Sequence, residues 1–296
     1  MRVLAIGESL IELQAVGRRQ LAWTFAGDVL NCAVAVARAE PSARVQHLTG
    51  IGDDEASAEF ISFCGTLGVD ARLSPVIANK TLGLYWIASA DGDRRFSYWR
   101  SDSAARALFE SDQVELPERT YDLIIFSGIT LAIAGTFAPD LVHALAKARL
   151  AGAKIAFDTN FRQALWPDVG VARERIEQAV AISDFVHTSS DDLESLFSGH
   201  DDVVGRWSRV VGVEEMLTTH GSGPVSVVHR GSQMAFDPAP VPVVDSAGAG
   251  DAFYGTYLGC RLGGQSPEIA IERALQVGAT VVQWPGALGY LAADSP

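Results

Sequence analysis

The order of apolar and polar positions along this 296-residue chain predicts strands and helices that alternate through most of its length. Residues 3–6 form a short apolar run, and a helix is predicted from about Asp28 to Ala39, where apolar residues recur at helical spacing. Ser266 and Pro267 suit the cap and first residue of a final long helix. Further strands are predicted at residues 45–48, 123–126, 155–157, 185–187, 216–218 and 225–228. This alternation is typical of an α/β fold with a largely parallel sheet.

A segment between residues 82 and 100 departs from the alternation. Two extended runs, 82–89 and 94–100, are joined by Ala90-Asp91-Gly92-Asp93, and Asp-Gly between such runs indicates a β-hairpin. Tyr98 and Arg100 share one face of the second run, because side chains alternate along a strand. The aromatic residues of the hairpin could pack a dimer interface, or its Tyr and Arg could close over a polar ligand. We predict one main domain over residues 1–296, with a β-lid formed by about residues 11–25 and 75–104.

Composition and charge narrow the possible partners. The formal net charge is −13, which opposes binding to nucleic acid or to an anionic membrane surface but allows an anionic small molecule beside local basic residues. We see no apolar run that approaches the roughly 18 residues needed to span a bilayer. The three cysteines, Cys32, Cys64 and Cys260, have no disulfide or metal-binding pattern. We therefore expect a cytoplasmic protein that has neither nucleic acid nor membrane as a partner.

The strongest chemical signal is the run Asp245-Ser246-Ala247-Gly248-Ala249-Gly250-Asp251. It follows a predicted strand at residues 240–244 and precedes a predicted helix at residues 252–262. Small residues at 246–250 allow backbone N–H groups to point into one cavity at a helix N-terminus, which is a ready anion site. Asp251 could be a helix cap, but a carboxylate beside an anion hole also suits phosphoryl transfer, in which a base orients a hydroxyl. The chain has no P-loop motif and no G-x-G-x-x-G dinucleotide motif.

Residues 245–251, read as D-[ST]-x-G-A-G-D, resemble the C-terminal signature of the ribokinase-like (PfkB) carbohydrate kinases. The resemblance covers nearly the whole chain and implies a three-layer α/β/α sandwich with a small β-sheet lid. It also implies that Asp251 is the catalytic base and that Gly248, Ala249 and Gly250 form the anion hole. Gly27-Asp28-Val29-Leu30-Asn31 resembles the sugar-binding turn of the family, although Ala26 stands where the family usually has glycine.

Within this family the resemblance is closest to the 2-keto-3-deoxygluconate kinases. Three stretches carry it, namely residues 7–12, residues 83–85 together with 98–100, and residues 157–166. In those enzymes the matching Tyr and Arg positions surround the sugar acid and its carboxylate, which here implies substrate contacts from Tyr85, Tyr98, Arg100 and Arg162. The sugar-binding turn of the family implies further contacts from Gly27, Asp28 and Asn31. Two guanidinium groups suit a carboxylate-bearing substrate in a protein of charge −13.

The resemblance also implies ATP and Mg²⁺ as cofactors. Nucleotide contacts are expected from Ser189, Thr219, Gly221, Gly248 and Gly250. The acidic segment 188–194 lacks the asparagine of the family's N-x-x-E motif, so no direct Mg²⁺ ligand is assigned.

The implied reaction is in-line transfer, with Asp251 accepting the proton of a primary hydroxyl while the amides of residues 247–250 stabilise the transferring group. A fructokinase or another neutral-sugar kinase of the same fold is the first alternative, and convergence of Arg100 and Arg162 on one pocket would argue against it. A sugar-binding regulator without catalysis is the second. The aromatic face of the lid predicts a homo-oligomer.

Overall fold

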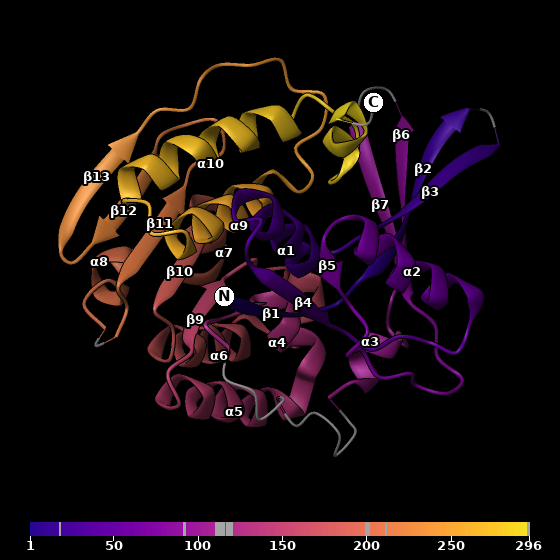
Figure 1. The fold of residues 1–296 in the computed structure, drawn as a ribbon, viewed down its shortest axis with the longest axis horizontal. Coiled ribbons are helices and arrows are strands. Elements are labelled where there is room, and N and C mark those ends of the chain that lie inside the picture. The colour runs from indigo at the N-terminus through magenta and orange to yellow at the C-terminus, as the bar shows by residue number, and fades with distance from the viewer. Residues whose placement is uncertain are drawn as a thin grey trace.

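The computed structural model describes residues 1–17, 19–90, 93–109, 116, 121–198, 202–210 and 212–294. In this part of the chain, nine strands form a central sheet in the order β13-β12-β11-β10-β9-β8-β1-β4-β5 (Figure 1). The strands from β11 to β5 in this order run parallel, and β12 and β13 add an antiparallel edge. Their bounds are β1 Arg2–Ile6, β4 Arg44–Leu48, β5 Val69–Asp70, β8 Leu123–Ser127, β9 Lys154–Asp158, β10 Phe185–Ser189, β11 Glu215–Thr219, β12 Val225–His229 and β13 Ser232–Phe236.

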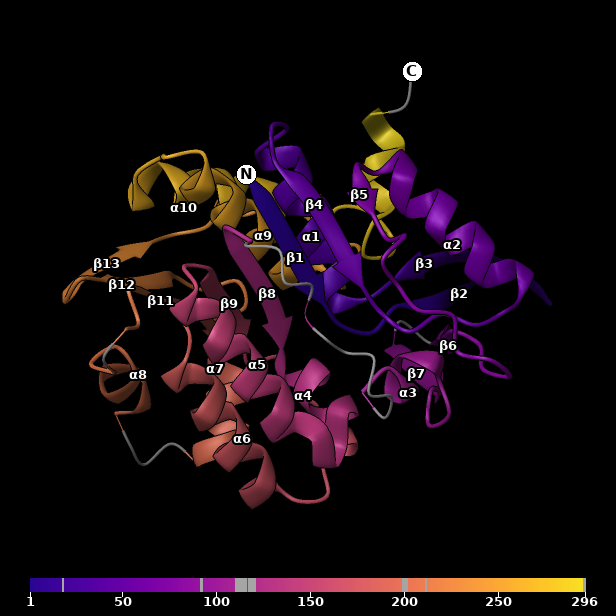
Figure 2. The ribbon, with the colours of Figure 1, turned by 60° about the horizontal axis from the view of Figure 1, so that its bottom comes forward.

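Helices cover both faces of this sheet because its strands are apolar on both sides. In β1, Val3 and Ala5 belong to one hydrophobic core, whereas Leu4 and Ile6 belong to the other. The first core includes α1 Asp28–Ala39, α2 Glu55–Thr66, α9 Ala249–Leu262 and α10 Pro267–Val281. The second includes α3 Ala104–Ala107, α4 Gly128–Ala134, α5 Ala138–Leu150, α6 Val169–Ala181, α7 Ser190–Phe197 and α8 Val203–Trp207. Figure 2 shows the two helical layers on either side of the sheet, so the predicted α/β/α sandwich is confirmed.

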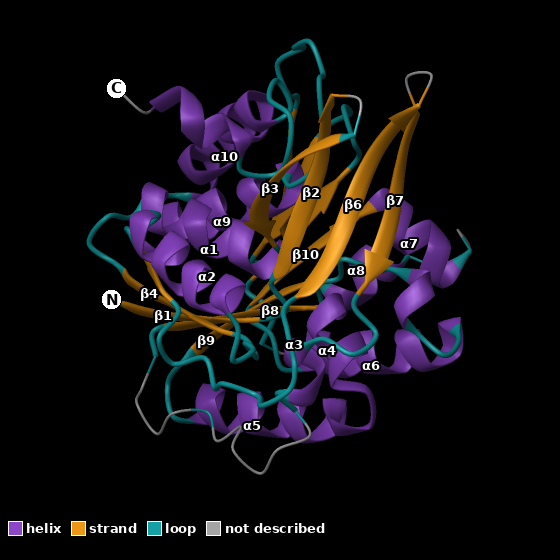
Figure 3. Cartoon of the chain, turned by 90° about the vertical axis from the view of Figure 1, so that its right-hand side faces the viewer, coloured by secondary structure: helices purple, strands orange, loops and turns teal. Residues whose placement is uncertain are grey.

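A second sheet stands beside the sandwich (Figure 3). Its order is β3-β2-β6-β7, with bounds β2 Leu10–Gly17, β3 Gln20–Ala26, β6 Gly83–Ala90 and β7 Asp93–Trp99. Because residues alternate along each strand, Leu10, Tyr85 and Ile87 are buried on one face with Ala26 and Ala287. The opposite face carries the exposed side chains of Trp23, Trp86 and Trp99.

The structure corrects the prediction around the glycine-rich run. Residues 240–244 are not a strand, since Pro240 and Pro242 supply no N–H for a sheet ladder. The N–H of Val244 donates instead to the carbonyl oxygen of Val282, the residue that follows α10. Helix α9 begins at Ala249 rather than at residue 252, so Asp251 lies inside its first turn and is not its cap. The predicted turn at Asp91-Gly92 lies outside the described residues.

One stretch is apolar and long enough to cross a membrane by length and composition alone. Among the described residues this is Gly128–Leu150, and half of its most apolar window is buried inside the protein. It is not one continuous helix: α4 ends at Ala134, the 3₁₀ turn η1 Gly135–Phe137 follows, and α5 begins at Ala138. Leu131, Ile133, Leu141 and Leu145 of this stretch pack into the second core.

Candidate active site

A cavity of about 950 Å³ opens at the carboxyl ends of the parallel strands, beneath the second sheet. Asp158, Ser189 and Thr219 reach it from the last residues of β9, β10 and β11. The carboxyl edge of such a sheet is where α/β proteins usually bind ligands. Tyr85, Phe96 and Tyr98 line the cavity from the second sheet, and the glycine-rich run lines it from the start of α9.

The glycine-rich run forms a compact turn into α9. Gly248 has φ +73°, and a Cβ added there would lie 2.6 Å from the Ala287 Cβ, so glycine is required. Ala247 N donates to Asp245 Oδ1 at 2.9 Å, and Ala249 N donates weakly to Ser246 O at 3.3 Å. Within the described residues, no acceptor is found for the amides of Gly248 and Gly250, both of which line the cavity. Of the four amides at residues 247–250, those of Gly248 and Gly250 are therefore the two that remain available to an anion.

Asp251 lies at the cavity with its carboxylate held by a distant residue. Asn31 Nδ2 of α1 donates to Asp251 Oδ2 at 2.8 Å. Burial raises the pKa of Asp251 from 3.8 to about 7, with the nearby charges of Asp28 and Asp158 adding to the shift. A carboxylate with a pKa near neutrality is well matched to accepting a proton from a hydroxyl at physiological pH.

A basic cluster, made of Arg100, Arg106 and the carboxylate of Glu8, lies beneath the second sheet. The Arg100 guanidinium forms an ion pair with Glu8, which is almost fully buried and also accepts a hydrogen bond from Ser103 Oγ at 2.6 Å. The guanidinium also lies over the Tyr98 ring, 5.7 Å from its centroid. Tyr85 donates its hydroxyl to the buried Glu12 carboxylate, which fixes the tyrosine ring in the cavity wall.

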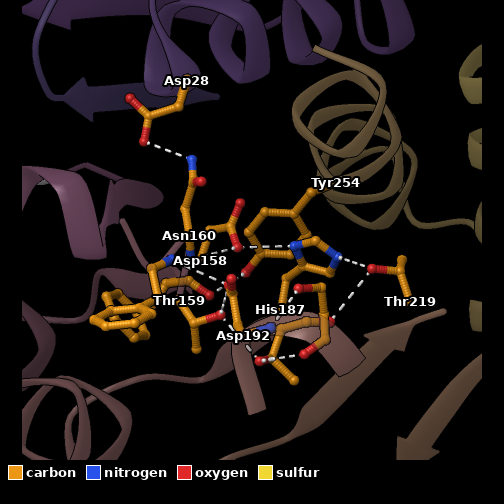
Figure 4. A network of polar contacts seen from close by, with 12 residues as sticks. Asp28, Asp158, Thr159, Asn160, His187, Asp192, Thr219 and Tyr254 are labelled. Carbon is orange, nitrogen blue, oxygen red and sulfur yellow. Dashed lines mark hydrogen bonds and ion pairs between the residues drawn. The ribbon is translucent and has the colours of Figure 1, made fainter. Parts of the chain in front are cut away.

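An acidic network lies at the carboxyl ends of β9 and β10 and lines the same cavity (Figure 4). Asn160 Nδ2 donates to Asp28 Oδ2 at 3.0 Å, and the Asn160 backbone N–H donates to Asp158 Oδ1 at 3.3 Å. His187 Nδ1 lies 2.9 Å from Asp158 Oδ1, and His187 Nε2 lies 3.3 Å from Thr219 Oγ1. Polar contacts thus run without a break from α1 to the end of β11.

The charge states of this network follow from burial and from the clustering of acids. Burial lowers the pKa of His187, but the charges of Asp158, Asp192 and Asp251 more than offset it, so the His187 pKa lies above its usual value. Burial raises the pKa of Asp192, whose Oδ2 accepts hydrogen bonds from Thr159 Oγ1 at 2.7 Å and from Phe161 N at 3.1 Å.

Most of the residues predicted from the sequence come together at this cavity. Those that line it are Gly27, Asp28, Asn31, Tyr85, Tyr98, Arg100, Arg162, Ser189, Thr219, Gly248, Gly250 and Asp251. Two predicted residues lie outside its lining. Ala249 is the first residue of α9, and Gly221 occupies an exposed turn between β11 and β12.

The sequence reasoning missed four residues of the site. Glu8 belongs to the stretch 7–12 that carries the family resemblance, but that stretch does not predict its contact with Arg100, 92 positions away. His187 was placed on a strand but given no role. Asp192 lies in the first turn of α7, three residues after the cap residue Ser189, and its side chain lines the cavity. Arg106 lines the cavity from α3, which no pattern had predicted.

Known proteins resemble this chain along nearly its whole length. A family model described as pfkB family carbohydrate kinase matches residues 2–291. A 2-dehydro-3-deoxygluconokinase from Dickeya dadantii (strain 3937) is 35% identical over 299 residues, 97% of this chain and 96% of the relative. Fructokinase-1 from Oryza sativa subsp. japonica is 32% identical over 237 residues, 78% of this chain and 72% of the relative. The crystal structure of a fructokinase with bound ATP from Xylella fastidiosa matches with TM-score 0.80 and 25% identity, over 98% of this chain and 94% of that chain.

Proposed function

This chain belongs to the pfkB family of carbohydrate kinases, and we propose that it is a 2-dehydro-3-deoxygluconokinase, which phosphorylates the primary hydroxyl of 2-keto-3-deoxygluconate with ATP. The similarity to the Dickeya dadantii enzyme supports this substrate over fructose, because it covers 97% of this chain, against 78% for the rice fructokinase.

The observation that carries the proposal is the distribution of charge in the cavity. Arg100, Arg106 and Arg162 line the same cavity as Asp251, so its wall offers positive charge to a substrate that carries a carboxylate. The Arg100 side chain comes from the residue after lid strand β7, whereas Asp251 comes from the first turn of α9. 2-Keto-3-deoxygluconate has matching ends, a carboxylate at C1 and a primary hydroxyl at C6. A neutral ketose has no group that needs the arginines.

In the proposed reaction Asp251 accepts the proton of the C6 hydroxyl while the hydroxyl oxygen attacks the γ-phosphorus of ATP. The new O–P bond forms as the bond from that phosphorus to the oxygen of ADP breaks. Asn31 positions the Asp251 carboxylate through its hydrogen bond. The amides of Gly248 and Gly250, which have no acceptor among the described residues, donate to the oxygens of the transferring group, where the N-terminal end of α9 also favours negative charge.

The acidic network fits Mg²⁺ carried in with ATP. Asp158 and Asp192 both line the cavity, and no group of three or more His, Cys, Asp or Glu side chains suited to a metal occurs among the described residues. Such a sparse set is compatible with Mg²⁺, which is commonly bound by one or two carboxylates together with substrate phosphates and water. When bound, Mg²⁺ supplies positive charge that offsets the charge of the triphosphate. Ser189 and Thr219 are the proposed contacts to the nucleotide.

The second sheet is proposed to act as a lid and as an interface between two copies of this chain. Tyr85 and Tyr98 on its inner face would exclude water from the bound sugar acid, which limits hydrolysis of ATP. On its outer face Trp23, Trp86 and Trp99 are 47%, 37% and 58% exposed, and apolar surface of this kind is usually covered in solution. Light scattering should find a dimer or larger oligomer that Trp86→Asp dissociates. We also infer a cytoplasmic protein.

The proposed activity is tested by a coupled assay of ADP release with Mg²⁺ and ATP. The substrates are 2-keto-3-deoxygluconate, 2-keto-3-deoxygalactonate, fructose and ribose, and Asp251→Asn is measured in parallel. We expect the highest kcat/KM with a keto-deoxy sugar acid and almost no turnover by the variant. A higher kcat/KM with fructose or ribose would reject the sugar-acid assignment. Binding of sugar without turnover, measured by calorimetry, would favour the regulator.

A further inference from the structure

Three arginines of the described part of the chain, Arg100, Arg106 and Arg162, line the cavity, and their charges are not equally available to a ligand. Arg100 is already paired with Glu8, whose side chain is 1% exposed, and the Arg100 side chain is itself 10% exposed. The charge of Glu8 therefore offsets that of Arg100 before any substrate binds. A pair buried to this degree is fixed in geometry, since breaking it would leave a charge in a site of low dielectric.

Arg162 lies beside Asp192, one of the carboxylates that line the cavity. Its Nη1 lies 4.0 Å from Asp192 Oδ1 and donates to Phe161 O at 2.9 Å. Burial raises the pKa of Asp251, and the positive charge of Arg162 opposes part of that rise, so Arg162 is within electrostatic reach of the catalytic carboxylate. Arg162 thus faces the carboxylates of Asp192 and Asp251, which partly offset its charge.

Arg106 is the remaining arginine of the cavity wall. Its Nε donates to the Arg100 carbonyl oxygen at 3.1 Å, which ties the side chain to the end of the lid strand β7. No carboxylate of the described residues lies within ion-pair distance of Arg106, and no acceptor among them takes a hydrogen bond from its Nη atoms. Burial raises the pKa of Glu8, while the charges of Arg100 and Arg106 act in the opposite direction and favour its carboxylate form. The cluster thus holds two guanidinium groups and one carboxylate, which leaves one positive charge.

We propose that Arg106 binds the C1 carboxylate of the substrate and thereby selects a sugar acid over a neutral ketose. The proposal rests on the function proposed above. The charge of Arg106 is the one in the cluster that Glu8 leaves uncompensated, and an Arg–carboxylate contact can be bidentate. Arg106 is hydrogen-bonded to the residue after lid strand β7, and Asp251 lies in the first turn of α9, so in this proposal the opposite end of the six-carbon chain extends toward Asp251. Glu8 is then a positioning residue that holds Arg100 beside the same carboxylate.

The test compares two substrates that differ at C1 alone, 2-keto-3-deoxygluconate and 3-deoxyfructose, in which a CH₂OH group replaces the carboxylate. We expect Arg106→Gln to lower kcat/KM for the sugar acid by about 10- to 100-fold, mainly through KM, because the contact is remote from the reacting atoms. The same variant should change kcat/KM for 3-deoxyfructose by less than about threefold. Arg106→Lys should recover part of the loss. Arg44→Gln, an exposed arginine at the start of β4, is the matched control.

Two results would overturn the assignment of Arg106. The first is an unchanged kcat/KM for the sugar acid in Arg106→Gln. The second is an equal loss with both substrates, which indicates a structural role. The preference of the wild-type enzyme is measured beforehand. If that enzyme prefers 3-deoxyfructose or fructose to the sugar acid, the proposed function fails together with this inference, whereas a preference for the acid with either result above rejects Arg106 alone.

Discussion

Replacing Asp251 by asparagine should abolish phosphoryl transfer and at the same time stabilise the folded protein at neutral and alkaline pH. The folded pKa of Asp251 is about 7, against 3.8 ordinarily, because burial and the nearby acids disfavour its charge. A raised folded pKa means that the unfolded chain loses this proton first as the pH rises. The wild-type protein therefore loses stability between about pH 4 and pH 7, relative to a variant that carries no charge there.

The magnitude follows from the shift. A difference of roughly three pKa units corresponds to about 4 kcal/mol at 1.36 kcal/mol per unit. Because the carboxylate faces a cavity and is not fully enclosed, we expect a gain of ~2–4 kcal/mol for Asp251→Asn above pH 7 and none at pH 4. The asparagine Oδ1 can still accept the hydrogen bond from Asn31, so the substitution removes a charge and little else.

Urea unfolding of both proteins without ligands at pH 4, 5.5, 7 and 8.5 measures this difference in free energy. Asp140→Asn, at an exposed position in the first turn of α5, is the control and should differ from wild type by no more than about 0.5 kcal/mol at each pH. In the wild-type enzyme, kcat/KM should rise about tenfold per pH unit up to pH 7 and then level off. A stability difference for Asp251→Asn that stays constant from pH 4 to 8.5, or a variant less stable than wild type at pH 8.5, would refute the reasoning.

Three further predictions concern the fold. Burial lowers the pKa of His47 from 6.5 to about 4, so the stability from its neutral form is complete above pH 6.5 and is lost as the pH falls to 4. This loss should be ~3 kcal/mol in urea unfolding and absent in His47→Gln. Glu215→Gln leaves the Arg261 guanidinium, 2.6 Å away, without its buried counter-charge and should destabilise by about 3 kcal/mol, whereas Glu177→Gln at an exposed ion pair should change stability by under about 0.5 kcal/mol. Equal effects of these two substitutions would contradict the role of burial. Gly27→Ala would place a Cβ 2.3 Å from the Glu8 carbonyl oxygen, so we expect a loss of about 2 kcal/mol or more in thermal unfolding, and an unchanged Tm would show that the backbone yields there.

The parts of the site that could be predicted are those in which the contributing residues are neighbours in sequence. The run of small residues before Asp251 indicated an anion hole, since consecutive amides at a helix start necessarily lie close together. The start of α9 was misplaced by three residues, because small residues are compatible with either a loop or a first helical turn. Asp192 was not assigned although its segment was recognised as acidic, because its role depends on Thr159 and Phe161 from another strand end.

The sequence by itself determined the alternation of strands and helices and the glycine-rich turn, because backbone periodicity and local turn geometry act over a few residues. Tertiary structure decided which charges are free to act. Glu8 compensates Arg100 across 92 positions, while Arg106 stands beside the same pair without a carboxylate among the described residues. Asn31 and Asp251, 220 positions apart, meet at a hydrogen bond inside the cavity. Desolvation and Coulomb interactions depend on distance through space, and this distance is set when the chain folds.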